Sequence, residues 1–420
     1  MTDSLADLDI ALPKLARKIR VLEALAWPDG LEERFLADWR AGRPTLPDVA
    51  LAPRDHQAEI EGLEALAGRC DVGHPAGHFV AATAHSYATA GRMLGAIGTP
   101  AFSEYSAQLY RRPDFYYERQ QLTALDAARF FLDTTDALLG GQHIPKTVAD
   151  IPAQDFAEWM QPELDLFFGP EMVRVVVDPE LASKAIAGAS RIRLRGGALF
   201  SELDKNQLLQ HEAFIHAATA QNGMLQTNLT CLGLGAPRTT PTQEGIAMLA
   251  ELLTGSIDIQ RLRRIALRVI AVQQALDGAD FIEVFRGFLE AGQSEEESFR
   301  SAQRVFRGAD VHGGSAFTKD ACYLTGLISV HTLLRVAIRD NRPELVSHLF
   351  AGRLTTADVV RLSPLFESGW LQPPRYVPHW ARDLRLLAAF FAFSAFAGRI
   401  KLDLIDLDRF IALEEEGSAG

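Results

Sequence analysis

Apolar residues recur at helical spacing over most of the chain, and this periodicity restricts the possible folds more than any other feature. Breaks rich in proline and glycine, such as WPDG and AGRPTLPD, divide the periodic stretches. The pattern predicts helices over residues 4–26, 31–40, 55–69, 77–96 and about 124–139, with further helices after residue 325. Most of the molecule should therefore be helical.

Strand-like patterns are confined to the middle of the chain. MVRVVVD (172–178) is rich in β-branched residues, and RIRLRGG (191–197) alternates arginine with isoleucine and leucine. The segment PELASKAIAGAS between them is typical of a helix. These signals predict a helix-rich α+β fold in three parts: a helical N-terminal region at 1–165, a catalytic α+β region at 166–325 and a helical C-terminal region at 326–420.

The charge balance and the apolar runs exclude some functions. The 420 residues carry a formal net charge of −12, whereas nucleic-acid binders are usually basic, so nucleic acid is not an expected partner. The most apolar run, Leu386 to Gly398, is too short to span a bilayer, and the first residues do not resemble a signal peptide. Three widely separated cysteines form no disulfide framework. We expect a soluble cytoplasmic protein without a membrane partner; the oligomeric state stays open.

The segment QHEAFIHAA holds two histidines, His211 and His216, with Glu212 directly after the first. Zinc peptidases place two histidine ligands and a glutamate base in the motif H-E-x-x-H, where the histidines are four residues apart. Here they are five apart, so on a regular α-helix their side chains would point about 140° away from each other. A π-bulge absorbs one extra residue in a helix. A shared metal site therefore requires a widened turn around Phe214-Ile215; otherwise the two are ordinary histidines.

A third ligand should come from the following helix, since zinc usually takes three protein ligands. TTPTQEGIAMLAELLTG (239–255) predicts such a helix, with Thr242 as its N-cap and Gly255 as its C-terminal stop. Glu244 would then lie in the first turn, where a carboxylate also suits the helix dipole. Glu251 lies seven residues further on the same face, where it could hydrogen-bond a ligand histidine or form an ordinary salt bridge.

Several segments together match one known family. They are HEAFIH, TQEGIA and RVFRGADVHGGSAFTKDACYLTG (304–326), with RLRGGALFSELDKNQLLQ and GTPAFSEYSAQLYRRP (98–113) in support. In these segments, which extend over most of the chain, the sequence resembles the QEGLA-motif family, known in animals as the microtubule-associated tyrosine carboxypeptidases. One departure is Ile246, which stands where the family motif has leucine and exchanges one apolar residue for another.

The resemblance implies a zinc metallopeptidase with a zincin-like core. Zn²⁺ would be bound by His211, His216 and Glu244, and Glu212 would be the general base. The characterised animal members remove a C-terminal tyrosine from tubulin, which implies a peptide or protein C-terminus as substrate. This chain lacks a long basic extension suited to an acidic microtubule surface, so tubulin itself is not the expected substrate. The alternatives to a carboxypeptidase are a non-catalytic metal-binding regulator on the same scaffold and a metal-dependent amidohydrolase for small molecules.

A carboxypeptidase must bind the free terminal carboxylate, and a fixed cation does this best. Arg304, Arg307 and Lys319 are the candidates for that role. Tyr323 lies four residues after Lys319, so the two would share a helix face, and Tyr323 is expected to help hold the oxyanion. Solvated or salt-bridged side chains are the alternative interpretation of all four residues.

The arginines of RIRLRGG suggest a second substrate contact. Zincin-type peptidases often bind an extended substrate along an edge strand. In such a strand Arg191, Arg193 and Arg195 would point to one side and form a basic stripe beside the substrate. Charged residues also commonly protect an exposed strand edge, so the stripe has a purely structural alternative.

Overall fold

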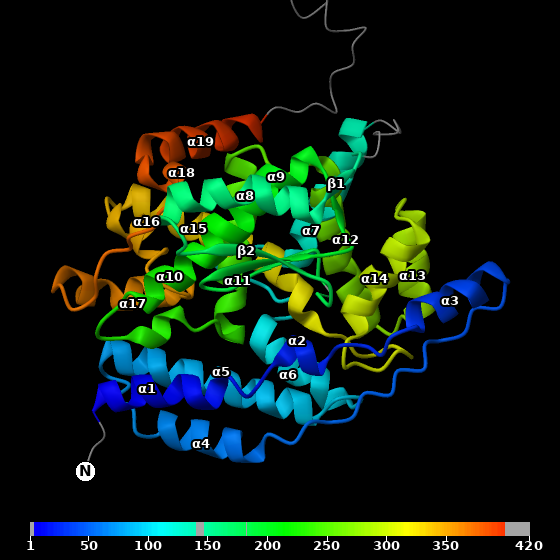
Figure 1. Cartoon of the computed structure of the whole chain (residues 1–420), viewed down its shortest axis with the longest axis horizontal. Coiled ribbons are helices and arrows are strands. Elements are labelled where there is room, and N and C mark those ends of the chain that lie inside the picture. Colours follow the sequence, from blue (N-terminus) through cyan, green and yellow to red (C-terminus); the bar gives the residue numbers. More distant parts are fainter. Residues whose placement is uncertain (1–3, 140–146, 182, 400–420) are drawn as a thin grey trace, which may run out of the picture.

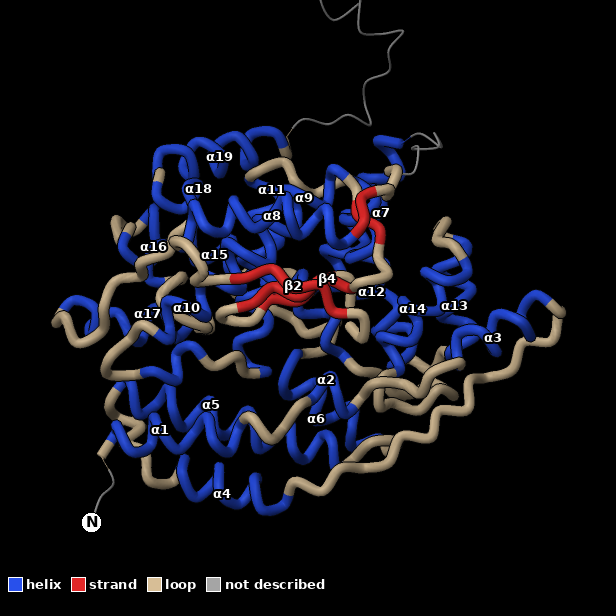
Figure 2. Tube along the Cα trace, in the orientation of Figure 1, coloured by secondary structure: helices blue, strands red, loops and turns tan. Residues whose placement is uncertain are grey.

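The computed structural model describes residues 4–139, 147–181 and 183–399. Helices make up most of it and the strands are confined to two small sheets, so the predicted helix-rich α+β fold is confirmed. A layer of N-terminal helices, coloured blue in Figure 1, lies below a central body that carries the sheets. In Figure 2 the strands lie in the middle of this body, with helices on either side.

The N-terminal part is helical, as expected. Its helices are α1 (Leu5–Ala16), α2 (Val21–Ala24), α3 (Leu31–Arg40), α4 (Gln57–Ala67), α5 (Pro75–Gly95), α6 (Pro100–Tyr110) and α7 (Ala124–Leu139). Four of the predicted helices are confirmed, but the helix predicted over residues 4–26 is interrupted between α1 and α2. The chain turns after the C-cap Arg17 and thereby buries Ile19, which a continued helix would place elsewhere.

The central part holds both sheets. Its elements are β1 (Ile151–Pro152), α8 (Ala153–Phe168), β2 (Arg174–Asp178), β3 (Ala185–Ala187), β4 (Arg191–Arg195) and β5 (Leu199–Phe200). β2 and β4 are parallel, β3 pairs with the other side of β4 in antiparallel orientation, and β1 pairs with β5. The inward side chains of β4, Ile192 and Leu194, are fully buried in one core cluster with Phe156 of α8.

The helix predicted over PELASKAIAGAS is wrong, because part of this segment is the strand β3. The N–H of Gly188 donates to the carbonyl of Arg191, and the N–H of Arg195 donates to the carbonyl of Lys184, so backbone pairing with β4 outweighs the helix propensity of the alanines. β4 is consequently the central strand of its sheet. The edge-strand role predicted for RIRLRGG is therefore wrong too, since both sides of β4 are already paired.

One long helical run carries the histidine motif. α9 (Glu202–Leu208) continues into the π-helix η1 (Leu209–Ala217) and then into α10 (Ala218–Met224). The short helices η2 (Thr230–Gly233) and η3 (Pro237–Thr239) connect this run to α11 (Thr240–Leu253). The N-cap of α11 is Thr239 rather than Thr242, so Glu244 lies one turn deeper in the helix than predicted. Gly255, with φ +64°, follows the end of α11 as expected.

α11 packs against α15 (Cys322–Arg339), which is preceded by η4 (Thr318–Ala321). The two helices touch at Gly245 and Gly326: a Cβ atom on either glycine would overlap the backbone of the opposite helix. The stretch Thr318–Arg339 is long and apolar enough to cross a membrane by length and composition alone. Here it packs inside the molecule and helps to position Glu244, as a core helix does.

The remaining helices complete the body. They are α12 (Ile259–Leu276), α13 (Phe281–Glu290), α14 (Glu295–Phe306), α16 (Glu344–His348), α17 (Thr356–Glu367), α18 (His379–Arg382) and α19 (Leu384–Ala397). The largest core cluster contains Leu12 of α1, Ile215 of η1, Ile246 of α11 and Leu362 of α17. One core thus runs through all three predicted regions, whose boundaries stay a prediction.

Candidate metal centre

The π-helix brings the two histidines together. η1 extends over nine residues, Leu209–Ala217, and includes the whole HEAFIH motif. Because a π-helix bonds residue i to residue i+5, side chains five apart lie on about the same face. The rings of His211 and His216 are 4.8 Å apart, centroid to centroid, and stand at 85° to each other. The widened turn that the sequence requires is therefore present. It is not a single bulge but about two turns of π-helix.

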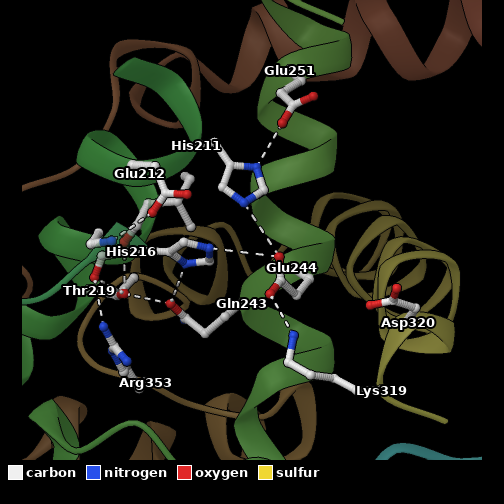
Figure 3. A network of polar contacts seen from close by, with 12 residues as sticks. His211, Glu212, His216, Thr219, Gln243, Glu244, Glu251, Lys319, Asp320 and Arg353 are labelled. Atoms are coloured by element: carbon white, nitrogen blue, oxygen red, sulfur yellow. Dashed lines mark hydrogen bonds and ion pairs between the residues drawn. The ribbon is translucent and has the colours of Figure 1, made fainter. Parts of the chain in front are cut away.

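Glu244 of α11 approaches the same point from the other side (Figure 3). Its Oε2 atom lies 3.4 Å from Nε2 of His211 and 3.8 Å from Nε2 of His216. These three ligand atoms all lie within 4.8 Å of one another. Oε2 is also buried and accepts no hydrogen bond from a described residue, so a carboxylate oxygen that lacks a hydrogen bond lies at ion-pair distance from two imidazole nitrogens. Two imidazoles and one carboxylate arranged in this way can hold a divalent metal ion.

The far nitrogen of His211 is held by a chain of buried contacts. Nδ1 lies 2.7 Å from Oε1 of Glu251, so the Nε2 atom faces the centre. Arg261 of α12 binds both oxygens of Glu251, at 2.5 and 2.6 Å, and Gln207 donates to Oε1 at 2.9 Å. The structure thus combines the two roles considered for Glu251, since it contacts the histidine and forms a salt bridge. Metal-binding histidines typically have such a carboxylate partner.

The far nitrogen of His216 faces an amide. Nδ1 lies 3.5 Å from Oε1 of Gln243, and the hydroxyl of Thr219 donates to the same oxygen at 2.7 Å. Gln243 directly precedes Glu244, so consecutive residues of α11 contact the two sides of one imidazole. Gln243 and Glu244, the Q and E of the QEG segment, therefore both contact His216 in the candidate centre.

Charges around the centre alter the pKa of its members. Burial alone would lower the pKa of His211, but the carboxylates of Glu244 and Glu251 outweigh burial and raise the pKa to about 10. Burial would raise the pKa of Glu244, but Lys319 and the two imidazoles hold it well below its usual range. The carboxylate of Glu244 is therefore ionised, as a metal ligand must be.

Glu212 points away from Glu251 and toward the sheet (Figure 3). The N–H of Ala187, in β3, donates to Oε2 of Glu212 at 2.9 Å. Oε1 makes no hydrogen bond with any described residue and is left to take a proton. Glu212 therefore has a fixed orientation beside His216 and one unused oxygen, which suits a general base.

In Figure 3 Lys319 lies on the opposite side of Glu244 from Glu212, and the ring of Tyr323 lies next to Lys319. Nζ of Lys319 is 3.5 Å from Oε1 of Glu244 and 5.9 Å from the centroid of the Tyr323 ring. Burial, together with the negative charge of Glu244, raises the pKa of Tyr323. Its hydroxyl therefore keeps its proton at neutral pH and can donate it in a hydrogen bond.

The other predicted substrate residues differ in their contacts. Arg304 is held by two hydrogen bonds to Asp320, at 2.7 and 2.6 Å, whereas Arg307 forms no hydrogen bond or ion pair with a described residue. Arg193 pairs with Asp178 at 3.2 Å. Arg193 lies with Arg195 on the outer face of the central strand β4, where no backbone edge is available to a substrate.

The sequence analysis missed two arginines that contact the centre. Nη2 of Arg353 lies 3.4 Å from the carbonyl oxygen of His216, and Arg261 clamps Glu251. Arg353 is 137 positions away from its partner, and only the fold brings them together. Arg261 lies in the first turn of α12, after its N-cap Asp258, and nothing in this local sequence indicates that its partner is Glu251.

The sequence model of one family matches most of the chain. This family is described as microtubule-associated tyrosine carboxypeptidase, and the match extends over residues 33–399. The matched residues include the histidine motif in η1, the QEG segment in α11, and the helix α15 that packs against α11. A comparison with curated proteins finds no match.

Proposed function

The chain belongs to the microtubule-associated tyrosine carboxypeptidase family, and from this premise we propose that it is a zinc-dependent carboxypeptidase that removes the last residue of a peptide or protein. The single observation that supports the metal is the unpaired, buried Oε2 of Glu244, enclosed by the Nε2 atoms of His211 and His216. The nitrogen and oxygen donors of this set suit zinc. The small mixed sheet beside the motif helix supports a zincin-like core.

Different residues of the chain have different roles in the proposed hydrolysis. Zinc bound by His211, His216 and Glu244 would supply a Lewis acid for the scissile carbonyl and lower the pKa of a water molecule. Glu212 accepts the proton of the attacking water on Oε1 and passes it to the leaving amine. Because Ala187 holds Oε2 of Glu212, the carboxylate keeps its direction through both transfers.

Tyr323 and Lys319 are the candidates for stabilising the oxyanion that develops on the carbonyl. Both lie beside Glu244, and both carry a hydrogen-bond donor in a site with little water. Donors that are in place before the reaction stabilise developing charge without reorganisation. In this proposal the base and the oxyanion donors act from opposite sides of Glu244.

The decisive experiment compares free and amidated peptides. Wild-type protein and Glu212→Gln are assayed with peptides that end in tyrosine, and the zinc content of both is measured. We expect about one zinc per chain in both proteins, cleavage of free-ended peptides by the wild type, and a fall in kcat of about 10²- to 10⁴-fold in the variant. Glu290→Gln, an exposed change on α13, is the control and should keep full activity.

Three other outcomes would contradict the proposal in different ways. Zinc binding without cleavage of any free-ended peptide would favour a metal-binding regulator. Equal cleavage of free and amidated peptides would indicate an endopeptidase. Full activity of Glu212→Gln would remove Glu212 from the mechanism.

A further inference from the structure

Three half-buried arginines, Arg268, Arg304 and Arg307, lie around the carboxylate of Asp320 close to the candidate metal centre. Arg304 binds Asp320 through two hydrogen bonds. Arg268 of α12 and Arg307, at the end of α14, belong to the two helices that pack against η4, which carries Asp320, and both experience the charge of Asp320 and of Arg304. The cluster therefore carries more positive than negative charge in a half-buried place, where an anion would be bound favourably.

Neither Arg268 nor Arg307 has a partner among the described residues. The Nε atom of each is buried and donates no hydrogen bond, and neither guanidinium forms an ion pair. Burial and the like charge of Arg304 lower the pKa of Arg268 to about 9 and that of Arg307 to about 10. Both side chains are still cationic at neutral pH. Buried donors without acceptors mark a place where a ligand supplies them.

This cluster adjoins the metal centre. Asp320 follows Lys319, whose Nζ lies 3.5 Å from Oε1 of Glu244. The ring of Tyr323 lies 5.9 Å from Nζ of Lys319, and its hydroxyl experiences the charges of Glu244, Arg304 and Asp320. In Figure 3 Asp320 lies beyond Glu244 on the side away from Glu212. A substrate bound across the centre would therefore reach the cluster with one of its ends.

We propose that Arg268 and Arg307 together receive the terminal carboxylate of the substrate. This assignment rests on the proposed function and selects among the cations near the centre. Arg304 is neutralised by Asp320, and Lys319 is neutralised by Glu244, so neither has a free charge to offer. Arg268, which no sequence pattern indicates, joins Arg307 as a second cation without an ion-pair partner among the described residues, and an arginine fork matches a carboxylate.

Arg353 is the rival receptor, on the Glu212 side. Its Nε is also buried and unpartnered, but Nη2 approaches the carbonyl of His216 and the guanidinium fills the space that Gly235 leaves by lacking a Cβ atom. Arg353 also experiences the negative charges of Glu212 and Glu244. Because its guanidinium already contacts the carbonyl of His216, Arg353 serves as the matched comparison.

The first test measures how strongly the enzyme prefers a free C-terminus. Wild type, Arg268→Gln, Arg307→Gln, the double variant and Arg353→Gln are assayed with one peptide in free and amidated forms. We expect the double variant to raise KM for the free peptide at least tenfold and leave the amidated peptide unaffected, because only the free peptide has a carboxylate to lose. Arg129→Gln, an exposed change on α7, controls for loss of charge alone.

The second test measures binding without turnover. Glu212→Gln protein is titrated with N-acetyl-L-tyrosine and with N-acetyl-L-tyrosinamide by calorimetry, with and without the two arginine changes. Binding of the acid should weaken at least tenfold in the changed protein, and binding of the amide should stay the same. Thermal unfolding of Arg268→Met should show an unchanged or higher Tm, because the change removes one of several like charges.

The two tests fail in different ways. If the wild type cleaves neither peptide, the proposed function fails, and the calorimetric comparison still decides the anion site. Equal weakening of acid and amide binding would overturn the proposal. So would a kinetic result in which Arg353→Gln loses the preference for a free C-terminus and the double variant keeps it. A lower Tm of Arg268→Met would assign Arg268 a structural role instead.

Discussion

The chemistry of the centre depends on what each ligand side chain contacts with the atom that does not face the metal position. His211 and His216 direct Nε2 to a common point because Glu251 and Gln243 occupy their Nδ1 atoms. Glu244 keeps one oxygen unpaired for the same point, while Lys319 faces the other. A ligand set of this kind depends on its neighbours as much as on the ligands, since the neighbours fix ring orientation and charge.

Glu251→Gln should weaken zinc binding by about 10- to 100-fold while the protein remains folded. The amide can still accept a hydrogen bond from His211, but it removes the buried charge that Arg261 and His211 face. The zinc dissociation constant, measured by competition with a chelator, checks this, with Glu290→Gln as the control. An unchanged constant would mean that Glu251 serves only as the partner of Arg261.

Asp320→Asn should reduce stability in a manner that depends on pH. Burial would raise the pKa of Asp320, but Arg304 outweighs it and holds the pKa below its usual range. The carboxylate therefore stabilises the fold fully above the unfolded-state pKa of about 4, and this contribution is lost as the pH falls below it. Urea unfolding should show a deficit of about 3–5 kcal/mol for the variant at pH 7 and a smaller one at pH 3.

The control for this experiment is Asp29→Asn, an exposed change that should alter stability by less than about 0.5 kcal/mol at either pH. A deficit that is the same at pH 7 and pH 3 would show that the charge of Asp320 is not what stabilises the fold.

Whole elements position the ligands by how closely they pack. The π-helix supplies two ligands from one segment, and α11 supplies the third because it lies against η1 on one side and against α15 on the other. The α11–α15 contact passes through Gly245 and Gly326, where the backbones touch directly. Gly245 adjoins Glu244, so the distance between these helices sets the position of the third ligand.

Gly326→Ala should cost at least about 1–3 kcal/mol of unfolding free energy and weaken zinc binding as well. The new methyl group would overlap the backbone of Pro241 and force α11 away from α15, and Glu244 with it. Gly287→Ala on α13 is the matched control, because only a side-chain atom at 4.0 Å lies near the added methyl group. The control should be neutral or slightly stabilising. Equal behaviour of the two variants would contradict a tight contact.

In the whole molecule, hydrogen bonds connect the N-terminal helix α1 to η2, which lies beside the elements that carry the site. Asp9 of α1 is buried and accepts hydrogen bonds from the N–H and the hydroxyl of Thr230 and from the N–H of Cys231. These residues form η2, which packs against α10 directly after the histidine motif. The layer below the sheets and the candidate centre are therefore parts of one folded unit.

Asp9→Ala should lower the unfolding free energy of the whole molecule by about 3 kcal/mol, since it removes the acceptor of the buried N–H of Cys231 and of both donors of Thr230. Chemical denaturation followed by circular dichroism and by zinc release should show both signals shifting together. Asp29→Ala, at an exposed position without such contacts, should change little. Loss of the N-terminal helical signal alone, with zinc retained, would contradict the coupling.

The sequence by itself determined the local features of this protein. Apolar periodicity located most helices, β-branched and alternating residues located β2 and β4, and the spacing of His211 and His216 required a widened turn. These predictions hold because helix periodicity, strand alternation and the angle per residue depend on neighbours along the chain. Glu244 could be named as a candidate for the same reason, because it lies on the next helix after the motif.

Only the tertiary structure decided which distant residues meet. Part of PELASKAIAGAS, the strand β3, is extended because β4 offers it a partner, and β4 is not an edge strand for the same reason. Arg268, Arg261 and Arg353 reach the neighbourhood of the centre from α12 and from the loop before α17, and no local pattern records such contacts. Long-range packing, not spacing along the chain, also determined that Arg304 is neutralised and Arg307 is not, since a charge is free or paired only in relation to what the fold places beside it.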